Sequence, residues 1–440
     1  MTAPPAWTAL PFVVNLLLVA LLPLVAGRFW HSNRNKLLLS LVVALPVTVY
    51  LLAAPEHGAG WLLHSAKDYA GFIALLAALY ITSGGIHLKG SLAGTPVSNT
   101  GILAIGAVIA NLIGTTGASM LLIRPLLRAN ESRRRKAHIV IFFIFIVSNA
   151  GGLLTPMGDP PLYLGFLHGV PFAWTLGLIV PWLFVNGSLL VIFTLLDQRM
   201  LAREKPEPAP KIAEPLRLEG GLNFLWLAGV IGVVFASGAW GPQVIGNPDG
   251  ILGFQLAGLG LLAGLAWMTT RRSVREANRF TWGPLFEVAA IFAGIFVTMI
   301  PALRILEAEG GGLGLRSPRE FFWATGLLSG FLDNAPTYLT FTAVGTSVVR
   351  GIDPASGMGT ADLAPFAAHA AGGPLLAAIS CGAVFMGALT YIGNGPNFMV
   401  KAIAEEHRVT MPGFLGYLAW SLTVLIPLFA ILGFVWFTGR

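Results

Sequence analysis

Two acidic residues, Asp159 and Asp333, lie within otherwise apolar stretches, where a free carboxylate is costly. Asp159 ends the segment 151–159, GGLLTPMGD, and Asp333 opens the segment 333–337, DNAPT. A charged side chain at the centre of a bilayer costs about 2.5–3.5 kcal/mol on insertion scales, and such residues usually mark ion pathways or proton relays. The alternative is a structural role, because an Asp can also cap the start of a helix. Both residues are therefore candidates for holding a cation or a proton.

The segment around Asp159 recurs in the second half of the chain. Aligned on Thr155 and Thr390, the pattern Thr-x-x-Gly-[Asp/Asn]-x-Pro is repeated, and Asp159 then corresponds to Asn394. Both copies interrupt apolar stretches with Gly, Pro and hydrogen-bonding side chains. Hydrocarbon tolerates such backbone only where it is buried in protein or lines a cavity. Paired breaks in two halves of a chain indicate the binding site of a transporter.

Neutral oxygen atoms accompany the two acids, and hard cations such as Na⁺ prefer oxygen ligands. Asp159 and Asp333 are the candidate Na⁺ ligands. Half-helix C-termini at the breaks favour cations, whereas half-helix N-termini attract anions, so a carboxylate substrate stays open. Part of the set has a simpler interpretation, in which Ser and Thr only bond to neighbouring helices. The predicted ion- or substrate-binding residues are Thr115, Thr116, Ser119, Ser148, Asn149, Thr155, Gly158, Asp159, Asp333, Asn334, Thr337, Thr390, Gly393, Asn394 and Asn397.

The composition places the chain among membrane proteins. Of its 440 residues, 55% are hydrophobic and 11% are charged, and the mean hydropathy is +0.75. Soluble domains carry roughly 25% charged residues. The single cysteine, Cys381, excludes a disulfide within the chain. The sequence contains no Walker motif and no enzyme motif, so we expect neither ATP coupling nor catalysis. The net charge of +7 comes from Lys and Arg residues, most of which are predicted to lie in loops, and it does not indicate nucleic-acid binding.

Apolar stretches of about 20 residues predict helices that cross a membrane. They are 10–27, 37–52, 69–85, 139–165, 175–196, 222–240, 252–268, 285–303, 375–403 and 414–437. Two further stretches, 102–127 and 321–349, have polar residues at their middle. Each is consistent with a crossing or with a hairpin that enters and leaves on one side.

Lys and Arg residues distinguish these alternatives, because cytoplasmic loops carry an excess of both. If both broken stretches are hairpins, ten crossings remain and both termini lie outside the cytoplasm. Most of the 27 Lys and Arg residues then fall in cytoplasmic loops. The residues left outside are Lys67, Arg304, Arg316, Arg319, Arg350 and Arg440. This bias favours the hairpins.

The resulting layout is an all-α polytopic membrane protein with two inverted repeats. Each repeat has five transmembrane helices and a re-entrant helical hairpin. The first repeat is 1–196, with its hairpin at about 98–128 and a broken helix at about 139–165. The second is 222–440, with its hairpin at about 320–349 and a broken helix at about 375–403. The charged, Pro-rich segment 197–221 is predicted to be a cytoplasmic linker.

Nearly the whole chain resembles the ion transporter superfamily. That group includes divalent anion/sodium symporters, citrate transporters, arsenite efflux permeases and Na⁺/H⁺ antiporters of the NhaD type. The most specific matching segments are 148–159, 333–337 and 393–397. The pattern GGxxTPxGD is most similar to the NhaD-type branch and to a neighbouring group named for citrate transport.

The hairpin tips differ from those of the dicarboxylate symporters, which carry paired Ser-Asn-Thr motifs. Here the tips are 114–116, GTT, and 333–335, DNA, while the motif SNT at 98–100 has no partner in the second half. The resemblance implies a scaffold domain, often dimeric, and a moving transport domain. It also implies one cation site between 115–119 and 149–159, and a second between 333–337 and 390–397.

These features predict a secondary-active transporter of the cell inner membrane, acting as a Na⁺/H⁺ antiporter by alternating access. The alternative is a transporter of citrate or another carboxylate, coupled to cations or protons. No resident cofactor is expected, since Na⁺ and H⁺ are the coupling ions. The expected partners are small ions or a small substrate, the lipid bilayer and a second copy of the chain in a homodimer.

Overall fold

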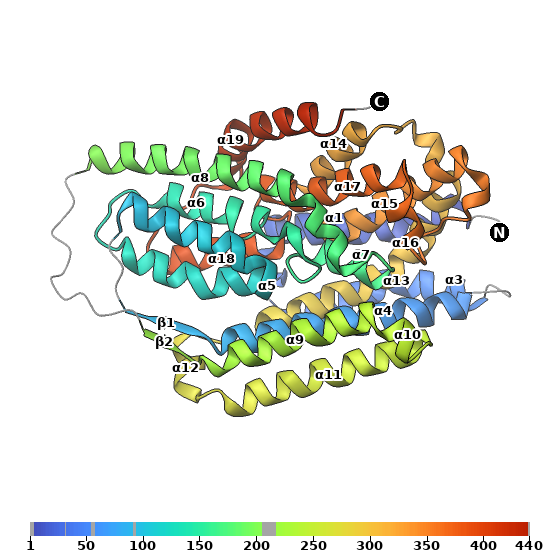
Figure 1. The fold of residues 1–440 in the computed structure, drawn as a ribbon, viewed down its shortest axis with the longest axis horizontal. Coiled ribbons are helices and arrows are strands. Elements are labelled where there is room, and N and C mark those ends of the chain that lie inside the picture. The colour runs from blue at the N-terminus through green and yellow to red at the C-terminus, as the bar shows by residue number, and fades with distance from the viewer. Residues whose placement is uncertain (1–3, 31, 54–57, 91–93, 205–216, 439–440) are drawn as a thin grey trace.

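The computed structural model describes residues 4–30, 32–53, 58–90, 94–204 and 217–438. In these residues the regular structure is almost entirely helical (Figure 1). The one sheet found there has two short antiparallel strands, β1 (His87–Lys89) and β2 (Arg217–Glu219). The predicted fold class, an all-α polytopic membrane protein, is confirmed.

The helices of the first half surround a central broken helix. In chain order they are η1 (Ala6–Ala9), α1 (Leu10–Val25), α2 (Gly27–Trp30), α3 (Asn33–Ala53), α4 (Gly58–Gly84), α5 (Pro96–Ala129), α6 (Ala137–Ile146), η2 (Ala150–Leu154), α7 (Pro160–Leu167), η3 (Phe172–Leu178) and α8 (Ile179–Ala202). The break lies between α6 and α7, where the chain forms the short 3₁₀ helix η2 and then an extended segment.

The second half also contains a broken helix. Its helices are α9 (Leu222–Ala239), α10 (Gly241–Val244), α11 (Pro248–Thr269), α12 (Arg272–Ala277), α13 (Gly283–Glu309), η4 (Gly310–Leu313), α14 (Pro318–Ser329), α15 (Asn334–Ile352), η5 (Pro354–Ser356), α16 (Ala364–Ala368), α17 (Gly372–Met386), η6 (Gly387–Leu389), α18 (Gly395–Glu406) and α19 (Phe414–Val435). A second break lies between α17 and α18, at η6.

Ten helices among the described residues are long and apolar enough to cross a membrane. They include α5 but not the 16-residue α1, whereas the sequence predicts a crossing at 10–27 and a hairpin at about 98–128. Length and composition alone cannot separate these two cases, because a hairpin with two apolar arms has the same hydropathy as a long span. The backbone inside α5 separates them.

The helix α5 turns back on itself at Gly114. This residue has φ +77° and ψ 155°, a conformation that glycine adopts without strain. The side chains of Asn99, near the start of α5, and Asn130, just after its end, exchange hydrogen bonds of 3.0 and 2.7 Å. Both ends of α5 therefore lie together, and the helix is a hairpin with its tip at Gly114.

The helices α14 and α15 form a second hairpin. Ser317 caps α14 in a capping box with Glu320, and Asp333 caps α15. The rings of Phe321 and Phe341 lie 6.5 Å apart, one on each arm. In Figure 1, α5 lies toward the left of the molecule, whereas α14 and α15 lie toward the right.

Several predicted boundaries differ from the structure, among them that of α13, which ends at Glu309 rather than at residue 303. The helix α4 begins at Gly58 rather than at residue 69, so Lys67 lies inside a helix and not in a loop. Hydropathy marks only the apolar part of a helix, and α4 continues through polar turns. The helix α8 likewise passes residue 197 and ends at Ala202, and the end of the predicted linker forms β2. Residues 205–216 of that linker lie outside the described residues.

Burial differs sharply between the central and outer helices. Residues 138–146 of α6 are all buried, whereas α3 exposes Leu38, Leu41, Val42 and Leu45. Large apolar side chains on an outer surface are typical of a protein surrounded by lipid. The broken helices therefore form the core, and the two breaks are shielded from the bilayer by other helices, as an interrupted backbone requires.

Candidate ion and substrate site

The two breaks have the same backbone conformation. Thr155 and Thr390 are extended, with φ/ψ of −139°/156° and −134°/169°. Asp159 and Asn394, four residues later in each copy, have −148°/146° and −152°/139° and precede α7 and α18. The repeated sequence pattern thus corresponds to a repeated structure: a 3₁₀ turn, an extended threonine, a turn and the start of a half-helix.

The glycines of the pattern allow each break to close on itself. A Cβ atom on Gly158 would lie 2.1 Å from the carbonyl oxygen of Gly152, and one on Gly393 would lie 2.6 Å from that of Gly387. Both distances are far shorter than a carbon–oxygen contact, so neither position accepts a side chain without a backbone shift. Gly152 and Gly158 are six residues apart, as are Gly387 and Gly393, and each pair lies at the point where the break closes.

Each repeated threonine ties its break to the hairpin of the same half. The hydroxyl of Thr155 donates to the carbonyl oxygen of Asn111, three residues before the tip of α5. The hydroxyl of Thr390 donates over 2.5 Å to the carbonyl oxygen of Gly330, at the end of α14. These hydroxyl groups form hydrogen bonds with backbone carbonyl oxygens and so position each break against its hairpin.

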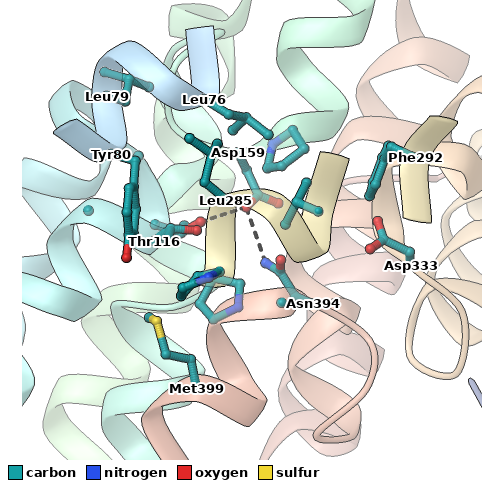
Figure 2. Close-up of a pocket in the computed structure, with 18 of the residues that line it drawn as sticks. Leu76, Leu79, Tyr80, Thr116, Asp159, Leu285, Phe292, Asp333, Asn394 and Met399 are labelled. Atoms are coloured by element: carbon teal, nitrogen blue, oxygen red, sulfur yellow. Dashed lines mark hydrogen bonds between the residues drawn. The ribbon is translucent and has the colours of Figure 1, made fainter. Parts of the chain in front are cut away.

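Asp159 is buried at the point where both hairpins and both breaks meet. Its Oδ1 accepts hydrogen bonds from the Thr115 hydroxyl at 2.8 Å and from Asn394 Nδ2 at 3.1 Å. Its Oδ2 accepts one from Asn334 Nδ2 at 2.5 Å. Figure 2 shows the side chains of Asp159 and Asn394 pointing toward each other. Three neutral donors therefore face one carboxylate, and no described basic side chain pairs with it.

A second layer of amides joins the two breaks behind Asp159. Asn149 Nδ2 donates to Asn397 Oδ1 at 2.7 Å, and Asn394 Nδ2 also lies 3.2 Å from Asn149 Oδ1. The hydroxyls of Ser119 and Ser148 share a hydrogen bond of 2.8 Å. Buried polar groups are costly unless they are paired, so this network holds the two breaks in one relative position.

Asp333 caps a helix and also lines the cavity. Its Oδ1 accepts a hydrogen bond of 3.1 Å from the backbone N–H of Ala335 and caps α15, while Thr337 donates to its carbonyl oxygen at 2.9 Å. Its half-buried side chain also lines the same cavity as Asp159, beside Phe292 (Figure 2). The capping bond uses one oxygen of the carboxylate and leaves the other available.

A cavity of about 380 Å³ lies in front of these groups. Its acidic lining residues are Asp159, Asp333 and Glu287, and no Lys, Arg or His is among the described residues that line it. Glu287 also pairs with Lys36 over 2.7 Å. The remaining wall is mainly apolar and aromatic. Asp159 and Asp333 have no basic partner among the described residues, so the cavity favours cations.

The predicted residues divide into two groups in the structure. Those that line the cavity are Thr115, Thr116, Gly158, Asp159, Asp333 and Asn394. Those that lie behind its wall, in the hydrogen-bond network or the folded backbone of the breaks, are Ser119, Ser148, Asn149, Thr155, Asn334, Thr337, Thr390, Gly393 and Asn397. Predicted residues from both halves, Thr115 and Asp159 from the first and Asp333 and Asn394 from the second, thus line a single cavity.

Sequence reasoning missed several residues of the cavity wall. Tyr80 and Tyr163, from α4 and α7, line it together with Glu287 from α13. The signal for Glu287 is an acid at the start of the third apolar stretch of the second half, a position common for acids that have no binding role. Nothing in the sequence distinguishes the two tyrosines from other aromatic residues of membrane helices.

One buried atom at the site has no hydrogen-bond partner in the described part of the chain. It is Oδ1 of Asn334, whose Nδ2 bonds to Asp159. A buried carbonyl oxygen without a donor is costly, and beside a carboxylate it is a suitable ligand for a hard cation. Asn334 therefore brings an unpartnered carbonyl oxygen from the second half of the chain next to the carboxylate of Asp159.

Comparison with known proteins agrees with this arrangement. The model of the family described as "Putative citrate transport" matches residues 1–437, nearly the full chain. No curated protein sequence matches the chain. The apolar helices, the paired breaks and the internal cavity are all features of a secondary transporter. The chain belongs to this citrate transport family and is a multi-pass membrane transporter.

Proposed function

We propose that this transporter exchanges Na⁺ for protons, and that Asp159 and Asp333 bind the two ions in turn. The observation that carries the proposal is the cavity wall, where Asp159 and Asp333 have no basic partner among the described residues, while the third carboxylate, Glu287, pairs with Lys36. A cation entering this cavity meets oxygen ligands and gains charge neutralisation. A free anion meets two unpaired carboxylates and gains nothing comparable.

The hydrogen bonds of Asp159 give a physical basis for exchange. As a carboxylate, it accepts from Thr115, Asn334 and Asn394. A bound proton removes the negative charge of the carboxylate and occupies one of its lone pairs. A bound cation needs the same oxygen as an electron-pair donor. Proton and cation therefore compete for one carboxylate, and occupation by either excludes the other.

The two hairpins provide a route to alternating access. Their tips meet at Asp159, through Thr115 of α5 and Asn334 of α15. The hairpins themselves lie toward opposite sides of the molecule (Figure 1). This arrangement supports two inverted repeats, with access from either side controlled by one hairpin. Location in the cell inner membrane, both termini outside the cytoplasm and a homodimer are further parts of the proposal.

A second candidate function is transport of citrate or another carboxylate with coupled cations. Two observations favour it: the description of the family, and the N-termini of α7, α15 and α18, which all begin beside the cavity. Helix N-termini attract anions. In this case a cation bound at Asp159 or Asp333 is needed first, because it offsets the repulsion between the carboxylates of the protein and those of the substrate.

Proteoliposomes with a trapped pH indicator test the first candidate. Addition of NaCl to one side is expected to change the internal pH with the native chain, without citrate present. The variants Asp159→Asn and Asp333→Asn are expected to lose this response. Asp249→Asn is the matched control, since Asp249 is 71% exposed and pairs only with Lys67 among the described residues.

The outcomes separate the two candidates. A Na⁺-dependent proton flux that is lost in both cavity variants and retained in Asp249→Asn establishes exchange through these acids. If correctly folded protein gives no flux with Na⁺, Li⁺ or K⁺, the antiporter proposal is wrong, and uptake of labelled citrate with each cation becomes the decisive measurement. Citrate uptake that requires a cation and is lost in Asp159→Asn supports the second candidate.

A further inference from the structure

Three metal-binding side chains meet outside the central cavity, where α4 lies against the end of α7. His64 and Asp68 are one helical turn apart on α4, and His168 follows the last residue of α7. Nε2 of His64 is 3.6 Å from Asp68 Oδ2, and Nε2 of His168 is 3.7 Å from the same oxygen. The three ligand atoms all lie within 4.8 Å of one another.

The hydrogen bonding of His168 fixes its available nitrogen. Its Nδ1 lies 2.8 Å from the carbonyl oxygen of Leu164 and must carry a proton there, because a carbonyl only accepts. In a neutral ring, Nε2 then carries a lone pair and faces the carboxylate of Asp68. A cation bound between these two acceptors removes the repulsion between them. A histidine ligand of a metal commonly has its other nitrogen bonded to a backbone carbonyl in this way.

We propose that His64, Asp68 and His168 form a binding site for a divalent transition-metal ion of the Zn²⁺ type. Two imidazoles with one carboxylate and an open position are a common set for Zn²⁺, with ligand distances of about 2.0–2.2 Å. Tetrahedral ligands at that range are separated by about 3.4 Å, close to the 3.6 and 3.7 Å observed. Nitrogen ligands disfavour Mg²⁺ and Ca²⁺, which prefer oxygen.

The three residues differ in exposure. The side chain of His64 is 55% exposed, whereas those of Asp68 and His168 are 13% and 7% exposed. Packing thus holds the side chains of Asp68 and His168 in place, whereas the exposed side chain of His64 is free to rotate and complete the site. The nearby charged groups are Lys67, which pairs with Asp249, and Asp362, whose Oδ1 lies close to Gly169. Acids outnumber bases here, which favours a cation.

The site joins two parts of the molecule that pack with different neighbours. The helix α4 packs mainly against α11, α13 and α5, whereas α7 packs mainly against α15. The helix α7 also begins directly after Asp159. A metal ion bound to both would hold the half-helix at the break against α4. Its effect on transport rests on the proposed function: the ion is expected to slow the alternation of access.

Binding of Zn²⁺ alone to the purified, chelator-treated full chain tests the site directly. Calorimetry is expected to give one Zn²⁺ per chain for the native protein. His64→Ala, Asp68→Asn and His168→Ala are each expected to weaken binding by about tenfold or more, since each removes a ligand. His407→Ala is the matched control, because His407 follows α18 and its Nδ1 lies 2.9 Å from the carbonyl oxygen of Ile403.

Two results would overturn the site: no Zn²⁺ binding by the folded native chain, or equal binding by His64→Ala, His407→Ala and the native chain. His64 is mostly exposed, so its replacement is expected to leave the fold intact and keeps the test decisive. Transport in proteoliposomes tests the consequence separately. Zn²⁺ is expected to slow the native protein and not His64→Ala. If binding is lost in the variant but transport is unaffected in both, the site stands and its role in transport is wrong.

Discussion

The carboxylate of Asp159 accepts a hydrogen bond of 2.5 Å from the side chain of Asn334, which lies 175 residues later in the chain. The bond joins the break of the first half to the hairpin of the second. Hydrogen bonds to charged groups contribute about 1.5–3 kcal/mol. The site therefore forms only when both halves are folded and in contact. Movement of either hairpin changes the hydrogen-bond partners of Asp159.

Replacement of Asn334 tests this relationship. Asn334→Ala removes both the donor to Asp159 and the unpartnered Oδ1 atom. We expect the concentration of Na⁺ or other coupling cation needed for half-maximal transport to rise about tenfold, which corresponds to about 1.4 kcal/mol. Thr340→Ala is the control, because Thr340 lies on the same helix and its hydroxyl bonds only to Pro336 among the described residues. Equal cation dependence in the two variants would contradict a ligand role for Asn334.

The glycines of the breaks are expected to tolerate no side chain. Gly158→Ala and Gly393→Ala each place a Cβ against a carbonyl oxygen of the same break, and we expect a loss of about 1–3 kcal/mol of stability in each. Gly187→Ala in α8 is the control, since nothing lies within 4 Å of its added Cβ. There alanine is expected to add about 0.5–1 kcal/mol. Thermal unfolding in detergent measures all three, and unchanged midpoints for Gly158→Ala and Gly393→Ala would show that the breaks can relax.

The amides of Asn149 and Asn397 are expected to act as a pair. Their hydrogen bond of 2.7 Å joins the two halves in the protein interior. In a double-mutant cycle, Asn149→Ala and Asn397→Ala are expected to show a coupling energy of about 0.5–3 kcal/mol. Denaturation of the two single variants, the double variant and the native chain supplies the four free energies. Strict additivity would mean that each amide acts only within its own half.

Asp197 is expected to stabilise the base of the first hairpin. Its carboxylate is buried and pairs with Arg133 at 2.5 Å, with His138 Nε2 at 2.7 Å and with Asn99 Nδ2 at 2.9 Å. Asp197→Asn leaves the charge of Arg133 buried without its partner, and we expect a loss of about 3–5 kcal/mol.

Asp249→Asn serves as the exposed comparison for Asp197→Asn. It breaks an ion pair with Lys67 at the surface, which is worth about 0–1 kcal/mol. The thermal midpoint of Asp197→Asn is therefore expected to fall well below that of Asp249→Asn. Similar midpoints would indicate that water reaches Asp197 and replaces its partners.

The repeated breaks and the two cavity acids could be predicted from the sequence because their signals are local. An apolar stretch interrupted by Gly, Pro and Asn is recognisable without knowing its neighbours, and the spacing of Thr155 to Asp159 recurs at Thr390 to Asn394. The limits of α4 were less predictable, since hydropathy marks where a helix contacts lipid and not where its hydrogen bonds begin.

A membrane protein with paired polar breaks is predictable from this chain's amino acids alone, because the cost of polar groups in hydrocarbon restricts where they can occur. The partners of each polar group become visible only in the folded molecule. The bond from Asn334 to Asp159, the place of Glu287 in the cavity wall and the meeting of His64 with His168 each join residues far apart in the chain. Such contacts depend on how helices pack, and packing leaves no local pattern in the sequence.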